Sequence, residues 1–187
     1  QLLLLSIGPS SVGLEEAVRP VEVLGTLHWP KDRAPVVVQL PDPESIQRLP
    51  GEWYGYEGVD LITISTSQPD LLRPLWADPK RWAALEEWVR QGGKLVLFLG
   101  AQAERLAGQT GQTGQAGQGG VWARLLPGRV VGSASLRSAA GYEMYADSTR
   151  PVPGLGRPET SLEVPRWQDL HGQVEVWQGD LPLVVRR

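Results

Sequence analysis

The chain has 187 residues, of which 41% are hydrophobic and 21% are charged, and its formal net charge is −3 at pH 7. This composition is typical of a globular domain, and the charge provides no basic patch of the kind that nucleic-acid-binding proteins carry. The complete absence of cysteine excludes disulfides, thiolate metal sites and a cysteine nucleophile. We therefore expect a single domain over residues 1–187 that does not bind nucleic acid.

The first part of the chain predicts three strands and little helix. Residues 2–7 form a short apolar run that ends at Gly8, which suits a strand buried on both faces. Two serines then precede a short predicted helix at 13–18, whose acidic side chains make its amino end unfavourable for a phosphate. Further strands are expected at 21–24 and 36–40, followed by a turn at 41–46 with one turn of helix.

The stretch 58–100 is the clearest unit in the sequence. It reads as a buried strand at 59–65, a helix, and a second buried strand at 94–99, which together predict a parallel βαβ unit. Asp78 followed by Pro79 marks the start of the helix, and a Gly-Gly pair marks its end. The helix should bury its tryptophans and leave the acids at 86 and 87 in solvent.

Two further details belong to this unit. Ser67 stands three residues before Asp70, which predicts a capping box at the start of a first helical piece. Pro74 then interrupts the pattern before the main helix begins.

The pattern changes after Gly100. Residues 108–120 form a tract rich in Gly and Gln, which we expect to be a flexible loop because it offers almost no apolar surface to bury. A short helix is predicted at 121–126. The remainder is punctuated by Gly and Pro and predicts short strands at 129–131, 162–164, 174–177 and 183–185, the last two joined by a hairpin turn. The fold class that we predict is α/β: a three-layer sandwich of the flavodoxin-like kind with a mainly parallel sheet, and an irregular β-rich C-terminal part.

Ligands of open α/β sheets bind outside the carboxyl ends of the strands, near the point where strand order reverses. Small polar residues follow the predicted strands at that edge, and Glu143 lies in a later polar and aromatic segment. The candidate ligand-binding residues are Ser10, Ser65, Ser67, Ala101, Gln102 and Glu143. The same residue types also suit the caps and turns of βα junctions, so a purely structural role remains an alternative.

Residues 56–64, the helix at 82–91 and the segment 92–100 resemble the class I glutamine amidotransferase-like superfamily, including its ThuA-like and other non-catalytic branches. In that family an aspartate-preceded strand is followed by a helix that ends in Gly-Gly, and the next strand leads into a nucleophile elbow. Catalytic members place a cysteine on the elbow, assisted by a histidine and a glutamate.

The chain departs from the family at every catalytic position. Residues 99–102 read Leu-Gly-Ala-Gln, with neither Cys nor Ser, and neither His28 nor His171 begins a His-x-Glu motif. A triad needs a nucleophile within hydrogen-bond reach of its base, which this chain does not supply. The two histidines also stand without an acidic cluster, so we expect no metal site. The resemblance therefore implies a pseudoenzyme with no catalytic residues and no cofactor.

Three functions remain open. The leading hypothesis is a non-catalytic binding or interaction domain, cut from a larger bacterial protein, with a protein partner or a small ligand. The first alternative is a hydrolase of carbohydrate or a small metabolite that uses Glu143 or Asp147. The second is a sugar-binding module that uses exposed tryptophans, for which the candidates are Trp29, Trp53, Trp167 and Trp177. No stretch of the chain is apolar over the length that spans a bilayer, so we expect a soluble domain without membrane contact, although its parent protein could be membrane-anchored.

Overall fold

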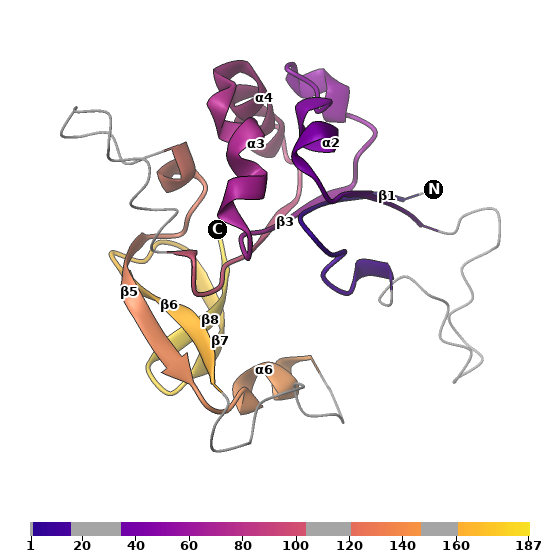
Figure 1. Ribbon diagram of the computed structural model, residues 1–187. Helices are drawn as coiled ribbons and strands as arrows, with labels where there is room; N and C mark the ends of the chain where they lie inside the picture. The colour runs from indigo at the N-terminus through magenta and orange to yellow at the C-terminus, as the bar shows by residue number, and fades with distance from the viewer. Residues whose placement is uncertain (1, 16–34, 104–120, 147–160) are drawn as a thin grey trace, which may run out of the picture. The chain divides into compact units, whose positions relative to one another are not determined.

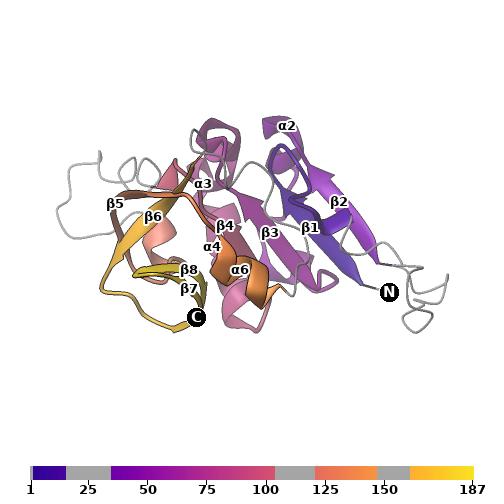
Figure 2. The same ribbon diagram turned by 90° about the horizontal axis from the view of Figure 1, so that it is seen from below.

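The computed structural model describes residues 2–15, 35–103, 121–146 and 161–187. The chain forms two compact units, Gln1–Phe98 and Leu99–Arg187, and each is described here by itself. The first unit contains a parallel sheet with helices, and the second contains antiparallel strands with short helices (Figures 1 and 2). The predicted α/β class is therefore confirmed, as is the β-rich C-terminal part. That both units belong to one domain stays a prediction.

Four parallel strands form the sheet of the first unit, in the order β2-β1-β3-β4. Their bounds are Leu3–Ile7 for β1, Val36–Leu40 for β2, Leu61–Ser65 for β3 and Leu95–Phe98 for β4. All four were predicted within two residues at each end. The predicted strand at 21–24 lies outside the described residues, as do residues 16–18 of the predicted helix at 13–18.

The register divides the sheet into an apolar and a mixed face. Leu5 aligns with Val38 and Ile62, and Ile7 aligns with Leu40 and Ile64, so these six apolar side chains share one face. Ile7, Ile62 and Ile64 are almost completely buried and form the centre of the core. The rows between them hold Ser6 beside Thr63, and Ser65 ends the mixed face at the carboxyl edge. Burial on both faces explains why the two central strands, β1 and β3, read as largely apolar runs rather than as alternating patterns.

Short helices connect these strands. They are α2 at Pro43–Gln47, η3 at Trp53–Tyr56, η4 at Pro69–Leu72, α3 at Arg73–Ala77 and α4 at Pro79–Arg90. Figure 1 shows α2, α3 and α4 together on one side of the sheet, and these helices contact one another. They bury Ile46, Leu75 and Leu85 completely. The core of the first unit therefore consists of this helical layer and the apolar strand residues.

The ends of α4 are formed as the sequence predicts. Asp78 accepts hydrogen bonds from the backbone N–H of Lys80 at 3.0 Å and of Arg81 at 3.4 Å, so it caps the helix beside Pro79. After the helix, Gly92 has a φ of 103°, a conformation that favours glycine.

Two predictions about the helices are wrong. Ser67 does not cap a helix, because η4 begins at Pro69 after Gln68 and has no side-chain cap; the Ser67 hydroxyl is instead paired with that of Ser65. Glu86 does not lie on a solvated face either, since only 9% of it is exposed and its Oε1 accepts a 2.9 Å hydrogen bond from the indole N–H of Trp82. The helical pattern predicted Glu86 on the side opposite the core, because the pattern could not show that the indole of Trp82 would donate a hydrogen bond to its carboxylate.

The second unit consists of two antiparallel pairs. β5 at Arg129–Leu136 pairs with β6 at Leu162–Gln168, and β7 at Gln173–Gln178 pairs with β8 at Leu181–Arg186. The predicted hairpin is confirmed, because β7 and β8 pair in antiparallel orientation on either side of the turn at Gly179. Gly179 has a φ of 61°, a conformation that favours glycine. All four strands extend further than predicted.

The helices of the second unit are short. The segment predicted as a helix at 121–126 is the 3₁₀-helix η5 at Val121–Arg124, and a helix that was not predicted, α6, occupies Ala140–Tyr145. The Gly-Gln tract lies outside the described residues.

Candidate functional site

The carboxyl edge of the parallel sheet has the strand arrangement that usually positions a ligand site. The chain passes from β1 to β2 on one side and then continues with β3 and β4 on the other side of β1. The strand order therefore reverses between β1 and β3, and ligands of open α/β sheets bind outside this point. Ser10 follows β1, and Ser65 and Ser67 lie at the end of β3. The structure thus groups these three predicted residues at one edge of the first unit.

The strand ends come close together at this point. Gly8, directly after β1, has a φ of 147°, and a Cβ at this position would lie 2.9 Å from the Cβ of Ser65. An ordinary side chain would not fit there without movement of one strand end. The glycine is needed both for its backbone conformation and for the close approach.

Hydroxyl groups form two separate hydrogen-bonded sets at the carboxyl ends of β1 and β3. The Thr63 hydroxyl donates to the Ser6 hydroxyl at 3.2 Å, and Ser6 donates to the carbonyl of Ser10 at 3.3 Å. The hydroxyls of Ser65 and Ser67 lie 3.1 Å apart and bond to each other. Ser6, Thr63 and Ser65 are buried, whereas Ser10 and Ser67 are exposed. The exposed members can offer hydrogen bonds to a ligand, while the buried members fix the strand ends.

These serines are not arranged for nucleophilic catalysis. A serine hydroxyl becomes a nucleophile through an adjacent general base, most often a histidine. The partner of Ser65 is another hydroxyl, and the described part of the first unit contains no histidine. The chain also lacks cysteine throughout. Within the described residues, this edge therefore offers hydroxyl groups for hydrogen bonding, with no histidine beside them.

The other predicted site residues belong to the second unit. Ala101 is exposed and Gln102 half-buried in a turn that is closed by a 2.9 Å hydrogen bond from the N–H of Ala103 to the carbonyl of Gly100. Glu143 is half-buried on α6. Within the first unit, the structure brings the three serines together.

The remaining titratable candidates are only partly described. His171 is exposed in the second unit and donates its backbone N–H to the carbonyl of Pro127. His28 and Asp147 lie outside the described residues.

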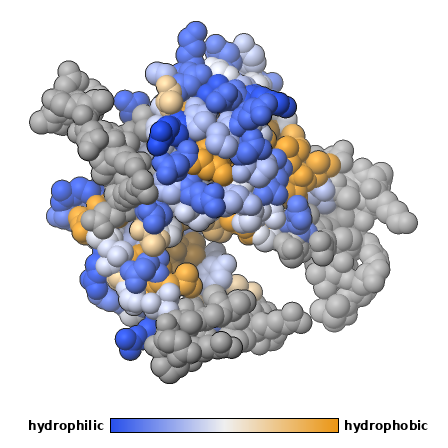
Figure 3. All heavy atoms as spheres, viewed as in Figure 1, coloured by the Kyte–Doolittle hydropathy of each residue, from blue (hydrophilic) through white to orange (hydrophobic). Residues whose placement is uncertain are grey.

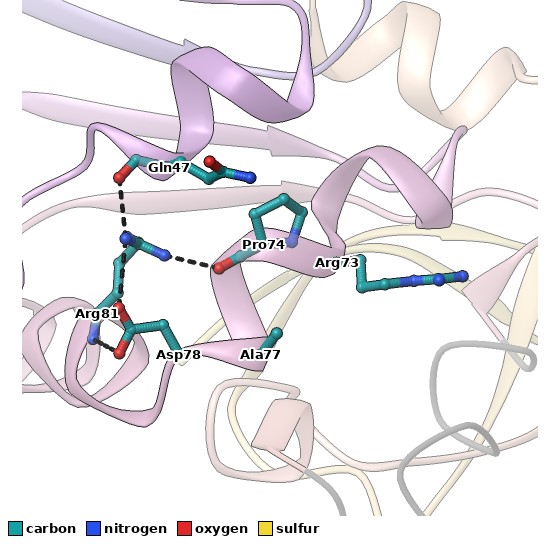
Figure 4. Close-up of a pocket in the computed structure, with 6 residues that line it drawn as sticks. All are labelled: Gln47, Arg73, Pro74, Ala77, Asp78 and Arg81. Atoms are coloured by element: carbon teal, nitrogen blue, oxygen red, sulfur yellow. Dashed lines mark hydrogen bonds and ion pairs between the residues drawn. The ribbon is translucent and has the colours of Figure 1, made fainter.

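A shallow depression of about 370 Å³ lies on the helical side of the first unit (Figure 4). Its centre is Arg81 on α4, whose side chain is only 13% exposed. The guanidinium donates to the carbonyls of Gln47 at 2.9 Å, Pro74 at 2.8 Å and Leu49 at 3.3 Å, and it forms an ion pair with Asp78 at 3.2 Å. Arg81 therefore joins the end of α2, the body of α3 and the start of α4.

This depression is a structural junction. The N–H groups of the Arg81 guanidinium already donate hydrogen bonds to backbone carbonyls. Some of these carbonyls lie at a helix end, where they have no partner within the helix. In Figure 4 the side chain of Arg73 points away from Arg81, and it pairs with Asp70 at 2.9 Å on the surface. Sequence analysis missed the junction, because one arginine on a helix carries no signal of where its guanidinium will lie.

Tyr56 shows a second perturbed environment in the first unit. Only 1% of the residue is exposed, its hydroxyl donates to the carbonyl of Pro50 at 3.1 Å, and its ring lies 6.1 Å from that of Trp88. Burial raises the pKa of Tyr56 to about 12, and the positive charge of Arg81 opposes this rise. The phenol therefore stays neutral and acts as a core residue.

The described tryptophans separate into core and surface residues. Trp82 and Trp88 are buried, as predicted, and Trp122 is buried in the second unit. Trp53 is 37% exposed beside Tyr54, with the two rings in an edge-to-face arrangement, and Trp177 on β7 is 51% exposed. Trp167 is half-buried, and Trp29 lies outside the described residues.

Across the described residues, no group of three or more His, Asp or Glu is arranged to hold a metal ion. None of the helices in the described ranges is both long and apolar enough to cross a membrane. In comparisons with known proteins, no family model, no curated protein and no solved structure matches this chain.

Proposed function

We propose that this chain is a non-catalytic binding domain that uses the carboxyl edge of its parallel sheet to contact a protein partner or a small polar ligand. The observation that carries the proposal is the pairing of Ser65 with the exposed Ser67 at the reversal of strand order, the point outside which ligands of open α/β sheets bind. Among the described residues, this edge offers exposed hydrogen-bonding groups and places no histidine beside its hydroxyls.

The strand order supports a flavodoxin-like, three-layer arrangement. Parallel strands in the order β2-β1-β3-β4 match the first four strands of the flavodoxin-like order, and the helices after β2 and β3 lie on one side of the sheet (Figure 2). The same order suits the resemblance to non-catalytic amidotransferase-like domains. In that interpretation the turn at Gly100 and Ala101, which follows β4, occupies the former nucleophile elbow.

A ligand screen by thermal shift, with neutral metabolites, short peptides and oligosaccharides, tests the proposal. We expect a compound that raises the melting temperature of the natural chain and has no effect on Ser67→Arg, because the larger cation fills the exposed edge. The matched control is Ser135→Arg, an exposed serine in the second unit, which should respond like the natural chain.

Turnover assays with chromogenic esters and glycosides complete the test. We expect no hydrolysis. Hydrolysis that disappears in Glu143→Gln would contradict the proposal and favour the hydrolase alternative.

A sugar-binding function is the second candidate, favoured by the exposed indoles of Trp177 and Trp53. Exposed aromatic rings offer a flat apolar surface beside a polar atom, which suits the faces of sugar rings. Oligosaccharides that quench tryptophan fluorescence in the natural chain but not in Trp177→Ala would support this function. Quenching that survives in both Trp177→Ala and Trp53→Ala would argue against it.

A further inference from the structure

Among the residues that the structure describes, the strand β2 forms one edge of the four-stranded sheet, and it carries no charge. Its sequence is Val-Val-Val-Gln-Leu, between Pro35 and Pro41. Edge strands of natural proteins are usually protected from pairing by charged residues, bulges or covering segments. Here Val36 and Val38 are each 40% exposed, and they continue the apolar face of the sheet beyond Leu5. Figure 3 shows hydrophobic residues in orange on the side of the first unit where β1 lies in Figure 1.

The hydrogen bonds to β1 define which backbone groups of β2 face outward. Val36 donates its N–H to the carbonyl of Leu2, and the carbonyl of Leu40 accepts from the N–H of Gly8. Because backbone groups alternate along a strand, the even-numbered residues of β2 bond to β1. The N–H and C=O groups of Val37 and Gln39 therefore point away from the sheet.

We propose that β2 pairs with the same strand of a second copy of this chain, in antiparallel orientation about a two-fold axis at Val38. Val37 then exchanges two hydrogen bonds with Gln39 of the second copy, and Gln39 exchanges two with Val37. Val38 faces its own counterpart as a non-hydrogen-bonded pair, and Val36 lies opposite Leu40. The prolines at 35 and 41 end the ladder on both sides.

Self-pairing suits this edge for two reasons. The strand has no charge, so two identical copies meet without like-charge repulsion. A two-fold axis perpendicular to the sheet also keeps the apolar faces on the same side, so the exposed valines of both copies join into one apolar surface. The ladder alone buries less than the about 1,200 Å² of a standard interface, so we expect a weak, concentration-dependent dimer.

The opposite edge of the sheet is less suited to this pairing. The strand β4 is one residue shorter, and Lys94 directly precedes it, which is a common protection against edge pairing. Its exposed residues Val96 and Phe98 align with Thr63 and Ser65, so they extend the mixed face rather than the apolar one. Val96 therefore provides a matched control on the other edge.

The absence of cysteine makes a direct cross-linking test possible. In a non-hydrogen-bonded antiparallel pair the two Cα atoms lie about 4.5 Å apart, within the range of about 4.4–6.8 Å that a disulfide spans. We expect Val38→Cys to form a disulfide-linked dimer under mild oxidation, and Val96→Cys, exposed to a similar extent, to stay mainly monomeric. Equal cross-linking of the two variants, or faster cross-linking of Val96→Cys, would overturn the proposal.

Sedimentation velocity on the unmodified chain gives an independent test. We expect the mean mass to rise toward twice the chain mass as the concentration approaches about 1 mM. Val37→Pro removes an outward N–H that β1 does not use, so this variant should keep its circular dichroism spectrum and melting temperature but lose the dimer. If Val37→Pro unfolds, Val38→Lys replaces it as the disrupting variant. A natural chain that stays monomeric throughout would overturn the proposal.

Discussion

A Cβ placed on Gly8 would lie 2.9 Å from the Cβ of Ser65, so β1 and β3 converge at their carboxyl ends more closely than two ordinary side chains allow. The polar edge that we propose as the binding site is built on this contact. Two residues earlier on the same two strands, the register places Ser6 beside Thr63, and their hydroxyls are hydrogen-bonded.

Gly8→Ala should therefore destabilise the protein. The change adds a Cβ against Ser65 and forces alanine into a φ of 147°, and strained conformations of this kind cost about 1–3 kcal/mol. Urea denaturation measures the free energy of unfolding. The control is Gly58→Ala, where no heavy atom lies within 4 Å of the new Cβ. Equal stability of Gly8→Ala and Gly58→Ala would show that the strand ends separate without cost.

Arg81 should be difficult to replace, even by lysine. Removing a nearly buried cation that donates to three carbonyls leaves those acceptors without their partner, and bonds to charged groups contribute about 1.5–3 kcal/mol each before relaxation. We expect Arg81→Lys to lose about 2–4 kcal/mol of unfolding free energy, because an ammonium cannot reproduce the planar fork. Arg48→Ala, which breaks an exposed ion pair with Glu44, should cost less than about 1 kcal/mol. If Arg81→Lys loses no more unfolding free energy than Arg48→Ala, the structural role that we assign to Arg81 is contradicted.

Tyr56 should make stability depend on pH in the alkaline range. Its pKa is about 12 in the folded chain against 10.0 for an unperturbed tyrosine, so the unfolded state loses the proton first. The stabilisation is complete below pH 10 and disappears as the pH rises to about 12, a total of about 2–3 kcal/mol. Urea denaturation between pH 9 and 12 should show this fall in the natural chain.

Tyr56→Phe is the control for that fall. It should lose about 1 kcal/mol at neutral pH, because it lacks the hydrogen bond to Pro50, and it should show a smaller decrease above pH 10. If the unfolding free energies of the natural chain and of Tyr56→Phe fall in parallel between pH 9 and 12, Tyr56 is not the group responsible for the fall.

The hydrogen bond from Trp82 to Glu86 predicts that replacing Glu86 lowers the stability of the protein more than replacing its neighbour Glu87. Glu86→Ala removes the carboxylate that accepts the Trp82 indole N–H inside the protein, which should cost about 1–3 kcal/mol. Glu86→Gln keeps an acceptor oxygen and should cost less. Glu87→Ala changes a more exposed acid that pairs with Arg90, so we expect an effect below about 1 kcal/mol. Thermal unfolding of the three variants ranks these losses, and a Glu87→Ala loss as large as that of Glu86→Ala would contradict the assignment.

The sequence predicted those parts of the first unit that depend on local patterns. The four strands are continuous apolar runs, and Asp78-Pro79 and Gly92 mark the ends of α4 through their own backbone preferences. Local patterns could not show which hydroxyl would pair with Ser67, because its partner belongs to a strand end and not to the following turn. They also could not show the burial of Glu86, since burial depends on which segments of the chain cover that face of α4.

The candidate site was predicted only as far as sheet topology allows. Ser10, Ser65 and Ser67 share one edge because parallel strands end together. Ala101 and Gln102 were predicted at the same edge because they follow the next parallel strand, and Glu143 because it is an acid in a later polar segment; all three belong to the second unit. The aromatic helix α6 was missed because its six residues are too few to show a helical period, and none of them is buried.

The junction at Arg81 has a consequence for how this protein can diverge. Its three hydrogen-bond acceptors are main-chain carbonyls, at Gln47, Leu49 and Pro74, and every residue type supplies the same oxygen. Side chains at those three positions can therefore change over evolutionary time without weakening the junction, as long as the backbone keeps its path. The arginine itself has no such freedom. Relatives of this chain could thus retain the same connection between their helices while sharing a single recognisable residue of it.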